Sequence, residues 1–276
     1  MTLPQPVDIL LERRKSTLIA TLNRPQAKNA LNAAIVDSLF SLCDWLNENR
    51  DIRAFVLRGA GGTFCAGGDI KEFASQLMAS DPAPGEADPV EKGNRRFGDL
   101  LLKLDALPQV VVSVIEGAAF GGAMGFVATS DVAIAASDAK FSLSETTLGL
   151  PPAQIGPFVV RKIGLFNARR LALTGARFVA EEASRVGLVD LIVAPNDIER
   201  ALTSTLNDIG RCEPGAIAAT KRIVNNAARS VDPRELDAAA KEFAKCLRGA
   251  GRIGAAAFAQ KQAPSWVQTY LERSQA

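Results

Sequence analysis

Two features of the chain could together carry out proton chemistry beside a carbonyl group. The first is the glycine passage of residues 117–125, which follows the predicted buried strand 110–115 and opens a short apolar helix. A helix start leaves backbone N–H groups without partners, and such donors stabilise negative charge that develops on a substrate oxygen. The second feature is Glu145, the only ionisable side chain between Lys140 and Arg161. A carboxylate there can accept or deliver a proton.

Another glycine-rich loop comes earlier and is the first of the two along the chain. It covers residues 59–69 and ends in Asp69, which can cap a predicted helix over residues 70–78. The loop lacks the Lys-Ser or Lys-Thr of a P-loop and the GxGxxG spacing of dinucleotide folds. Cys65 in this loop is either a reactive thiol or a small buried side chain, and the second interpretation is favoured. Alone, the loop predicts only a turn from strand to helix.

The residue types that are missing exclude several kinds of active site. The chain has no histidine, which excludes Ser-His-Asp and Cys-His nucleophiles and any zinc site with a histidine ligand. Its four cysteines form no CxxC pair, which argues against a disulfide scaffold or a thiolate metal site. We therefore expect no metal centre.

Composition predicts a soluble globular protein. Apolar residues make up 47% of the 276 residues, enough for a sizeable core. Lys plus Arg number 32 and Asp plus Glu 30, with no basic block, so we expect no nucleic-acid partner. No apolar run approaches the roughly 18 residues of a membrane span, and residues 1–7 do not resemble a secretory signal. The expected location is cytoplasmic, with no membrane partner.

Alternating strand and helix patterns up to about residue 195 predict an α/β core. After Pro195 only helical patterns follow, and they are rich in alanine, as faces that contact partner subunits often are. The predicted strands cover residues 9–13, 17–22, 54–58, 110–115, 132–135 and 189–193. The predicted helices cover residues 35–49, 70–78, 90–107, 157–164, 167–174, 180–186, 198–209, 214–228 and 236–247.

With both glycine loops and Glu145 placed, the chain resembles the enoyl-CoA hydratase/isomerase family, which has the crotonase fold. The resemblance implies a spiral of ββα turns over residues 1–195 that holds coenzyme A and the active site. It also implies a helical C-terminal part, residues 196–276, that builds homotrimers or dimers of trimers. The matching motifs lie at residues 23–31, 64–72, 116–125, 144–145, 173–175, 182–183 and 258–261.

The resemblance implies an acyl-CoA thioester substrate whose carbonyl lies between the amides of Ala66 and Gly122, with Glu145 handling the proton. Coenzyme A is then part of the substrate, and no separate cofactor is expected. Lys28 and Lys261 could instead be solvated charges, Phe258 a core residue and Glu145 a surface or capping residue. Residues implied to contact coenzyme A are Ala27, Lys28, Ala66, Gly67, Gly68, Asp69, Ile70, Gly122, Phe258 and Lys261.

The chain departs from the family pattern at Gly125, where well-known hydratases carry a first glutamate. One carboxylate, Glu145, fits a hydratase that activates water, or an isomerase that moves a proton between Cα and Cγ. A non-catalytic acyl-CoA binder is a third reading of the missing glutamate.

Residues 148–160 are similar to the corresponding segment of bacterial hydratases acting on 3-methylglutaconyl-CoA and isohexenylglutaconyl-CoA, which favours a branched or glutaconyl-type enoyl-CoA. A second carboxylate on such a substrate requires a cationic partner once enclosed. By residue type, Arg95, Arg96 and Arg161 are the candidates.

Overall fold

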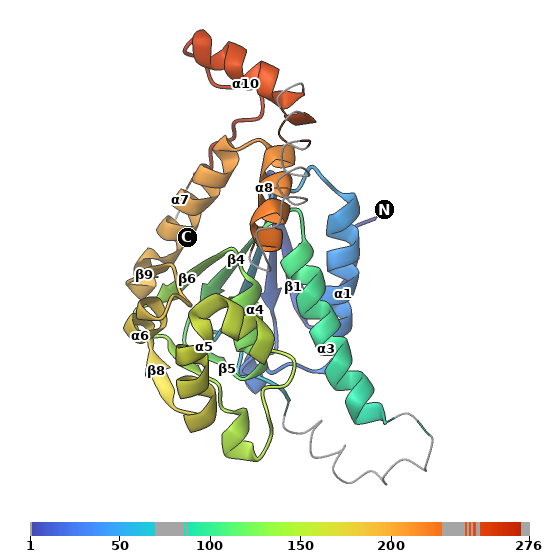
Figure 1. The fold of residues 1–276 in the computed structure, drawn as a ribbon, viewed down its shortest axis with the longest axis vertical. Helices are drawn as coiled ribbons and strands as arrows, with labels where there is room; N and C mark the ends of the chain where they lie inside the picture. Colours follow the sequence, from blue (N-terminus) through green and yellow to red (C-terminus); the bar gives the residue numbers. More distant parts are fainter. Residues whose placement is uncertain are drawn as a thin grey trace.

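The fold is built on a six-stranded sheet. The computed structural model describes residues 2–69, 86, 88–227 and 249–271, together with 241, 243, 245 and 246. The strand order is β1-β2-β3-β4-β6-β9, with β1 and β2 antiparallel and the other neighbours parallel (Figure 1). The strands are β1 (Ile9–Arg14), β2 (Thr17–Leu22), β3 (Ala54–Gly59), β4 (Val110–Ile115), β6 (Val132–Ala136) and β9 (Leu191–Val193).

Both faces of this sheet are buried, which explains why its central strands read as continuous apolar runs. Successive side chains point to opposite faces of a strand. Phe55 and Val111 therefore lie in the larger core, and Val56 and Val112 lie in a second core on the other face. The larger core is covered by α1 (Ala33–Glu48), α3 (Pro89–Ala106), α4 (Gly122–Thr129) and α5 (Gly156–Thr174); the second is covered by α7 (Ile198–Arg211) (Figure 1).

A second sheet of three short strands stands beside the first, in the order β5-β7-β8. It comprises β5 (Ala118–Phe120), β7 (Lys140–Ser142) and β8 (Arg177–Val179). Each strand has three residues, too few for a period of two to be recognised in the sequence. Strand β5 also lies inside the glycine passage, and the sequence analysis missed this sheet.

Most other predicted elements are confirmed, including the break between helices 157–164 and 167–174. Gly164 adopts φ 75° and ψ 157° inside α5, so two helical segments meet there. Residues 180–186 form α6 (Ala180–Arg185), and residues 214–228 match α8 (Pro214–Ala227). The predicted helix 70–78 and most of helix 236–247 lie outside the described residues.

The described parts of the chain beyond Pro195 lie in different places. Helix α7 packs on the sheet, whereas α10 (Ala250–Ala259) stands away from the α/β body (Figure 1). The chain then returns to the sheet, where the Tyr270 hydroxyl lies 3.0 Å from Ser16 Oγ and 3.2 Å from Thr17 Oγ1. A role of residues 196–276 in trimer formation stays a prediction.

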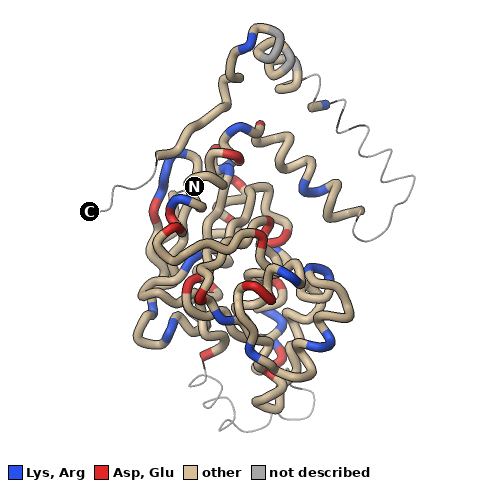
Figure 2. The backbone as a smooth tube through the Cα atoms, turned by 90° about the vertical axis from the view of Figure 1, so that its left-hand side faces the viewer, with Lys and Arg blue, Asp and Glu red and all other residues tan. Residues whose placement is uncertain are grey.

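Charged side chains are spread over the molecule. In Figure 2, Lys and Arg alternate with Asp and Glu over the body instead of gathering on one basic face. Within the described part of the chain, no helix is both long and apolar enough to span a bilayer.

Asn29 holds the loop before α1 against the first glycine loop. Its side chain is fully buried; Nδ2 donates to the carbonyls of Ala60 (2.9 Å) and Thr63 (2.6 Å), and Oδ1 accepts from the Arg24 amide (2.9 Å). The backbone at Asn29 is left-handed, with φ 55°, a conformation that asparagine tolerates better than most residues. One side chain therefore fixes the shape of two loops.

We predict that Asn29→Ala lowers the free energy of unfolding by about 2–4 kcal/mol, because it leaves buried carbonyls unpaired and puts alanine in a left-handed conformation. Urea unfolding followed by circular dichroism measures the change. Asn47→Ala is the control, since the exposed Asn47 side chain bonds only the Cys43 carbonyl within α1. It should change stability by less than about 0.5 kcal/mol. Equal losses in the two variants would contradict this role of Asn29.

Candidate active site

The two glycine-rich loops touch each other through backbone atoms. The Cys65 amide donates to the Ala118 carbonyl (2.9 Å), and the Phe120 amide donates to the Cys65 carbonyl (3.1 Å). A Cβ added to Gly67 would lie 2.8 Å from the Phe120 carbonyl oxygen, and one added to Gly121 would lie 3.8 Å from the Gly67 Cα. Both glycines have positive φ, 97° and 52°. The contact therefore requires glycine on both sides.

The amides of the first loop differ in what they bind. The Ala66 N–H donates to the Lys28 carbonyl at 3.0 Å. This bond disagrees with the expectation that Ala66 donates to a substrate, because its only backbone hydrogen is already used. Three residues after Lys28, the Leu31 carbonyl accepts from the Asp69 amide (2.9 Å), and the Leu31 amide donates to the Gly67 carbonyl (2.7 Å).

Gly68 lies between Gly67 and Asp69, the two residues that bond Leu31. Because backbone groups alternate in direction along an extended strand, the Gly68 N–H points away from Leu31. Within the described part of the chain this N–H has no hydrogen-bond partner. The sequence offered no way to choose between residues 66 and 68, because both point the same way along an ideal strand. Which of the two amides is free depends on how the chain bends here, because the bend brings the Lys28 carbonyl within hydrogen-bond distance of the Ala66 amide.

The second loop ends at Gly122, the first residue of α4. The preceding amide, of Gly121, donates to the Ser142 carbonyl (3.0 Å), while Gly122 stands where a helix leaves its N–H groups without an intrahelical acceptor. A Cβ added to Gly122 would lie 3.2 Å from Leu31 Cδ1 and 3.5 Å from Phe97 Cζ. The N-terminal end of α4 therefore faces apolar side chains, where a helix dipole acts with little screening.

Glu145 begins the 3₁₀ turn η2 (Glu145–Leu148) and extends toward the contact between the loops. Its Oε1 lies 3.4 Å from where a Cβ on Gly121 would be, and its Oε2 is buried without a hydrogen-bond partner in the described structure. Burial raises the pKa of the Glu145 carboxyl, although a hydrogen bond from its own backbone opposes the rise. A buried carboxyl oxygen that lacks a partner is unusual in a folded protein and marks a candidate proton carrier.

The position of the missing glutamate is filled by neighbouring side chains. A Cβ on Gly125 would lie 2.8 Å from Ile155 Cγ2 and 2.9 Å from Leu101 Cδ1. Such distances are too short for any side chain to fit unless these neighbours move. Leu101 and Ile155, with Phe97 in edge contact with Phe126 (centroids 5.7 Å apart), form an apolar wall beside α4. Leu101 and Phe97 lie in the predicted helix 90–107, but no pattern in the sequence connects them to the site.

Each of the three candidate arginines is paired with a carboxylate. Arg95 contacts Asp99 at 2.6 Å, one turn along the same helix. Arg96 binds Asp37 and Arg161 binds Asp105, at 2.5 Å and 2.9 Å. A substrate carboxylate would therefore have to compete with an aspartate for any of the three arginines.

The residues expected near coenzyme A fall into two groups. Ala27 and Lys28, at the end of the 3₁₀ turn η1 (Pro25–Ala27), join the first glycine loop through the bond to Ala66, and Lys28 is exposed. The carboxylate of Asp69 is 8% exposed and binds Arg24 Nη2 at 2.8 Å, so it anchors the loop. Ile70 lies outside the described residues.

The second group belongs to the region of α10. Lys261 is exposed and comes just after α10, the helix that stands away from the α/β body (Figure 1). For Phe258 only the backbone, in α10, is described. One copy of the chain does not bring Lys261 to the glycine loops.

Cys65 is a packing residue. It is fully buried, and burial raises the pKa of its thiol to about 12, which leaves it without thiolate character. Within the described residues, no group of three or more Cys, Asp or Glu side chains could hold a metal ion.

Comparison with known proteins agrees with this geometry. The family described as enoyl-CoA hydratase/isomerase matches residues 12–269. The structure of Pseudomonas aeruginosa AtuE is 46% identical with a TM-score of 0.90, covering 95% of this chain and 100% of that one. An enoyl-CoA hydratase/isomerase from Marinobacter aquaeolei is 41% identical with a TM-score of 0.90, covering 95% and 99%. The probable enoyl-CoA hydratase echA8 of Mycobacterium bovis is 33% identical over 260 residues, 94% of this chain and 97% of its own. The chain belongs to the enoyl-CoA hydratase/isomerase family.

Proposed function

We propose that the protein is an enoyl-CoA hydratase that adds water reversibly to a 2-enoyl-CoA. The observation that carries the proposal is the buried, unpartnered carboxyl oxygen of Glu145 beside the junction of two glycine loops. Named enoyl-CoA hydratases among the relatives support the reaction class. Coenzyme A enters as part of the substrate, and each chemical step uses backbone amides and this carboxylate.

In the proposed mechanism the N–H groups of Gly68 and Gly122 hold the thioester oxygen. Ionised Glu145 takes a proton from water while the water oxygen bonds to Cβ. The electron pair of the double bond moves to form an enolate, whose negative oxygen the two amides stabilise. The carboxyl group of Glu145 then gives its proton to Cα and returns to its starting state. Water is consumed, and the proton and oxygen are both accounted for in the 3-hydroxyacyl product.

A single carboxylate is sufficient in this scheme, because the proton removed from water is the one delivered to Cα. Leu101 and Ile155 fill the space at Gly125, which leaves no room there for a second carboxylate and supports a site with one acid. The same feature keeps an isomerase as the second candidate, since moving a proton from Cγ to Cα also needs only one carboxylate.

The side chains beside the site indicate which type of acyl chain the substrate carries. Phe97, Leu101 and Ile155 favour a branched apolar chain. A glutaconyl-type substrate would have to displace an aspartate from one of the paired arginines to neutralise its second carboxylate. We therefore rank branched apolar enoyl-CoA first and glutaconyl-type substrates second.

We also propose a homotrimer or dimer of trimers, which could bring Phe258 and Lys261 of one copy to the coenzyme A of another. The exposed apolar side chains of Leu165, Phe166 and Leu173 on α5 support an interface between copies.

The activity is tested with crotonyl-CoA, 3-methylcrotonyl-CoA and 3-methylglutaconyl-CoA, with products identified by mass. We expect a gain of one water, fastest on an apolar chain, and loss of roughly 10²–10⁴-fold in rate in Glu145→Gln because general acid–base catalysis is removed. Binding of butyryl-CoA to the variant should be retained. Conversion of a 3-enoyl-CoA to the 2-enoyl isomer without hydration would favour the isomerase. Unchanged turnover in Glu145→Gln would remove Glu145 from the mechanism.

The raised pKa of Glu145 predicts a pH-dependent effect on stability. A carboxyl whose pKa is higher in the folded state stabilises the fold at low pH, and this contribution is lost as pH rises through the folded-state pKa. Glu145→Gln should therefore raise the melting temperature at pH 8, with the difference fading toward the usual glutamate pKa of 4.5. Calorimetry across that range measures it. Glu48→Gln, at an exposed position in α1, should leave the wild-type pH profile unchanged.

Packing around Gly125 predicts that even a methyl group is costly there. Gly125→Ala should lower the free energy of unfolding by about 1–3 kcal/mol, because Leu101 and Ile155 must move. Gly93→Ala is the matched control, since Gly93 is also within a helix but has nothing within 4 Å of an added Cβ. That change should be neutral or stabilising by up to about 1 kcal/mol. Chemical unfolding compares them, and a neutral Gly125→Ala would contradict the packing argument.

A further inference from the structure

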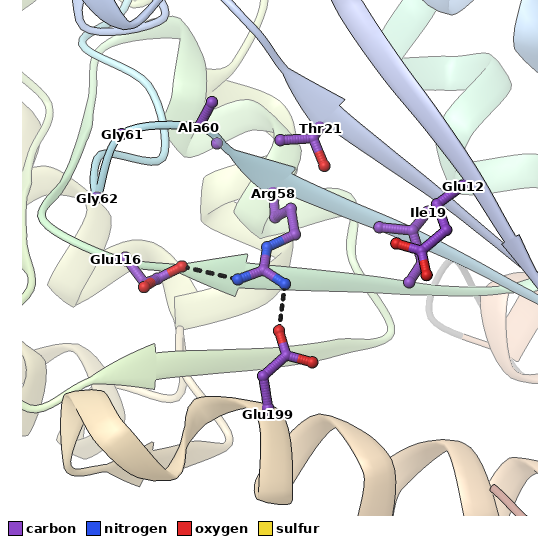
Figure 3. Close-up of a pocket in the computed structure, with 10 residues that line it drawn as sticks. Glu12, Ile19, Thr21, Arg58, Ala60, Gly61, Gly62, Glu116 and Glu199 are labelled. Atoms are coloured by element: carbon purple, nitrogen blue, oxygen red, sulfur yellow. Dashed lines mark hydrogen bonds and ion pairs between the residues drawn. The ribbon is translucent and has the colours of Figure 1, made fainter. Parts of the chain in front are cut away.

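A charged cluster lies outside the site, on the face of the sheet that α7 covers. It lines an open cavity of about 330 Å³ next to the first glycine loop (Figure 3). At its centre, Arg58 Nη2 binds Glu116 Oε2 at 3.1 Å, and Arg58 Nη1 binds Glu199 Oε1. Arg58 and Glu116 are 17% and 27% exposed in their side chains, so solvent screens this pair less than an ordinary surface pair.

Arg58 and Glu116 each come directly before one of the two glycine loops. Arg58 is the residue before Gly59, where the first glycine loop begins, and Glu116 is the residue before Gly117, the start of the second. Both residues follow the paired part of neighbouring parallel strands, β3 and β4. The ion pair therefore joins the two strands at the point where each becomes a glycine loop.

Beyond this pair the two loops have no room to shift independently. The Phe64 amide donates to the Glu116 carbonyl at 2.8 Å. A Cβ on Gly117 would lie 2.3 Å from the Gly62 carbonyl oxygen, and a Cβ on Gly59 would lie 2.0 Å from that of Thr63. Displacement of either strand end is thus transmitted through backbone contacts toward the amides further along each loop.

We propose that Arg58 is a positioning residue for catalysis: by binding Glu116 it sets the spacing of the two glycine loops, and hence of the Gly68 and Gly122 amides. The inference rests on the proposed function of those amides. Arg58 touches no reacting atom and acts through the loops. Glu199, on α7, holds the second nitrogen of the guanidinium and so fixes its direction.

The pKa of the Glu199 carboxyl is consistent with its role of orienting Arg58. Burial alone would raise the pKa of its carboxyl, but the hydrogen bond and charge of Arg58, with the charge of Arg14, outweigh burial and lower it. The carboxylate therefore stays ionised and keeps Arg58 oriented.

Arg14 provides a matched control within the same cluster. It contacts Glu199 at 3.3 Å and Glu12 at 2.8 Å, and its side chain is 15% exposed, close to the 17% of Arg58. Arg14 stands at the end of β1, which leads into no glycine loop. Loss of Arg14 removes a similar charge from the same carboxylate without touching the strand ends of the site.

The experiment compares Arg58→Met, Arg58→Lys and Arg14→Met in the full chain. Hydration kinetics give kcat and KM, and difference infrared spectroscopy of bound butyryl-CoA reports how strongly the amides polarise the thioester carbonyl. For Arg58→Met we expect kcat to fall roughly 10- to 100-fold, as displaced catalytic groups do. KM should change less than about twofold, and the carbonyl stretch should return toward that of free butyryl-CoA. Arg58→Lys should recover part of kcat, and Arg14→Met should change kcat less than about twofold.

Unchanged kcat and carbonyl stretch in Arg58→Met, or equal losses in the Arg58 and Arg14 variants, would overturn the inference. Should Arg58→Met not fold, Glu116→Gln removes the charge of the pair while keeping its shape, and the same pattern is expected several-fold weaker. Wild-type protein without hydratase activity would refute the proposed function instead. The infrared shift of butyryl-CoA in the variants would then still decide whether Arg58 sets the spacing of the amides.

Discussion

Two stretches of backbone can pack more closely than a Cβ atom allows only where glycine stands at the contact, and the proposed active site depends on such a contact. Gly67 faces the Phe120 carbonyl, and Gly121 faces both Gly67 and Glu145. The approach brings one amide from each loop into the same region, beside a buried carboxyl. Neighbouring features hold the two loops in place. The Asn29 side chain binds the outside of the first loop. The parallel strands β3 and β4 end on the same side of the sheet, so the loops that follow them lie together. Backbone donors held in this way need no reorganisation as charge develops, which is why we propose that they stabilise the enolate oxygen.

Much of this arrangement could be predicted from the sequence. Apolar runs located the strands of the large sheet. The sequence also singled out the two glycine passages and Glu145, and the structure places them side by side. What could not be predicted depends on three-dimensional bends and on contacts between distant residues. The bond from Ala66 to Lys28, which leaves Gly68 as the free amide, arises from a kink that no periodicity reveals. The filling of the Gly125 position by Leu101 and Ile155 likewise joins residues from three separate elements.

The proposed site exchanges stability for reactivity at Glu145. Burial raises the pKa of this carboxyl, so its ionised form costs folding free energy that an uncharged side chain would not cost. Gly125 carries no such cost, because Leu101 and Ile155 fill the space beside it. The charged cluster of Arg58, Glu116 and Glu199 lies on the face of the sheet that α7 covers, so in our proposal it orders the loops from outside the site.

The return of the chain from α10 to the first hairpin affects how the protein is made. Tyr270 is buried against Ser16 and Thr17, at the turn between the first two strands. During synthesis that hairpin leaves the ribosome more than 200 residues before its covering segment, as the sequence positions require. The turn between β1 and β2 therefore lacks this cover until residue 270 has been made. The contact joins segments far apart in the sequence, so it forms only after the strands between them have been synthesised.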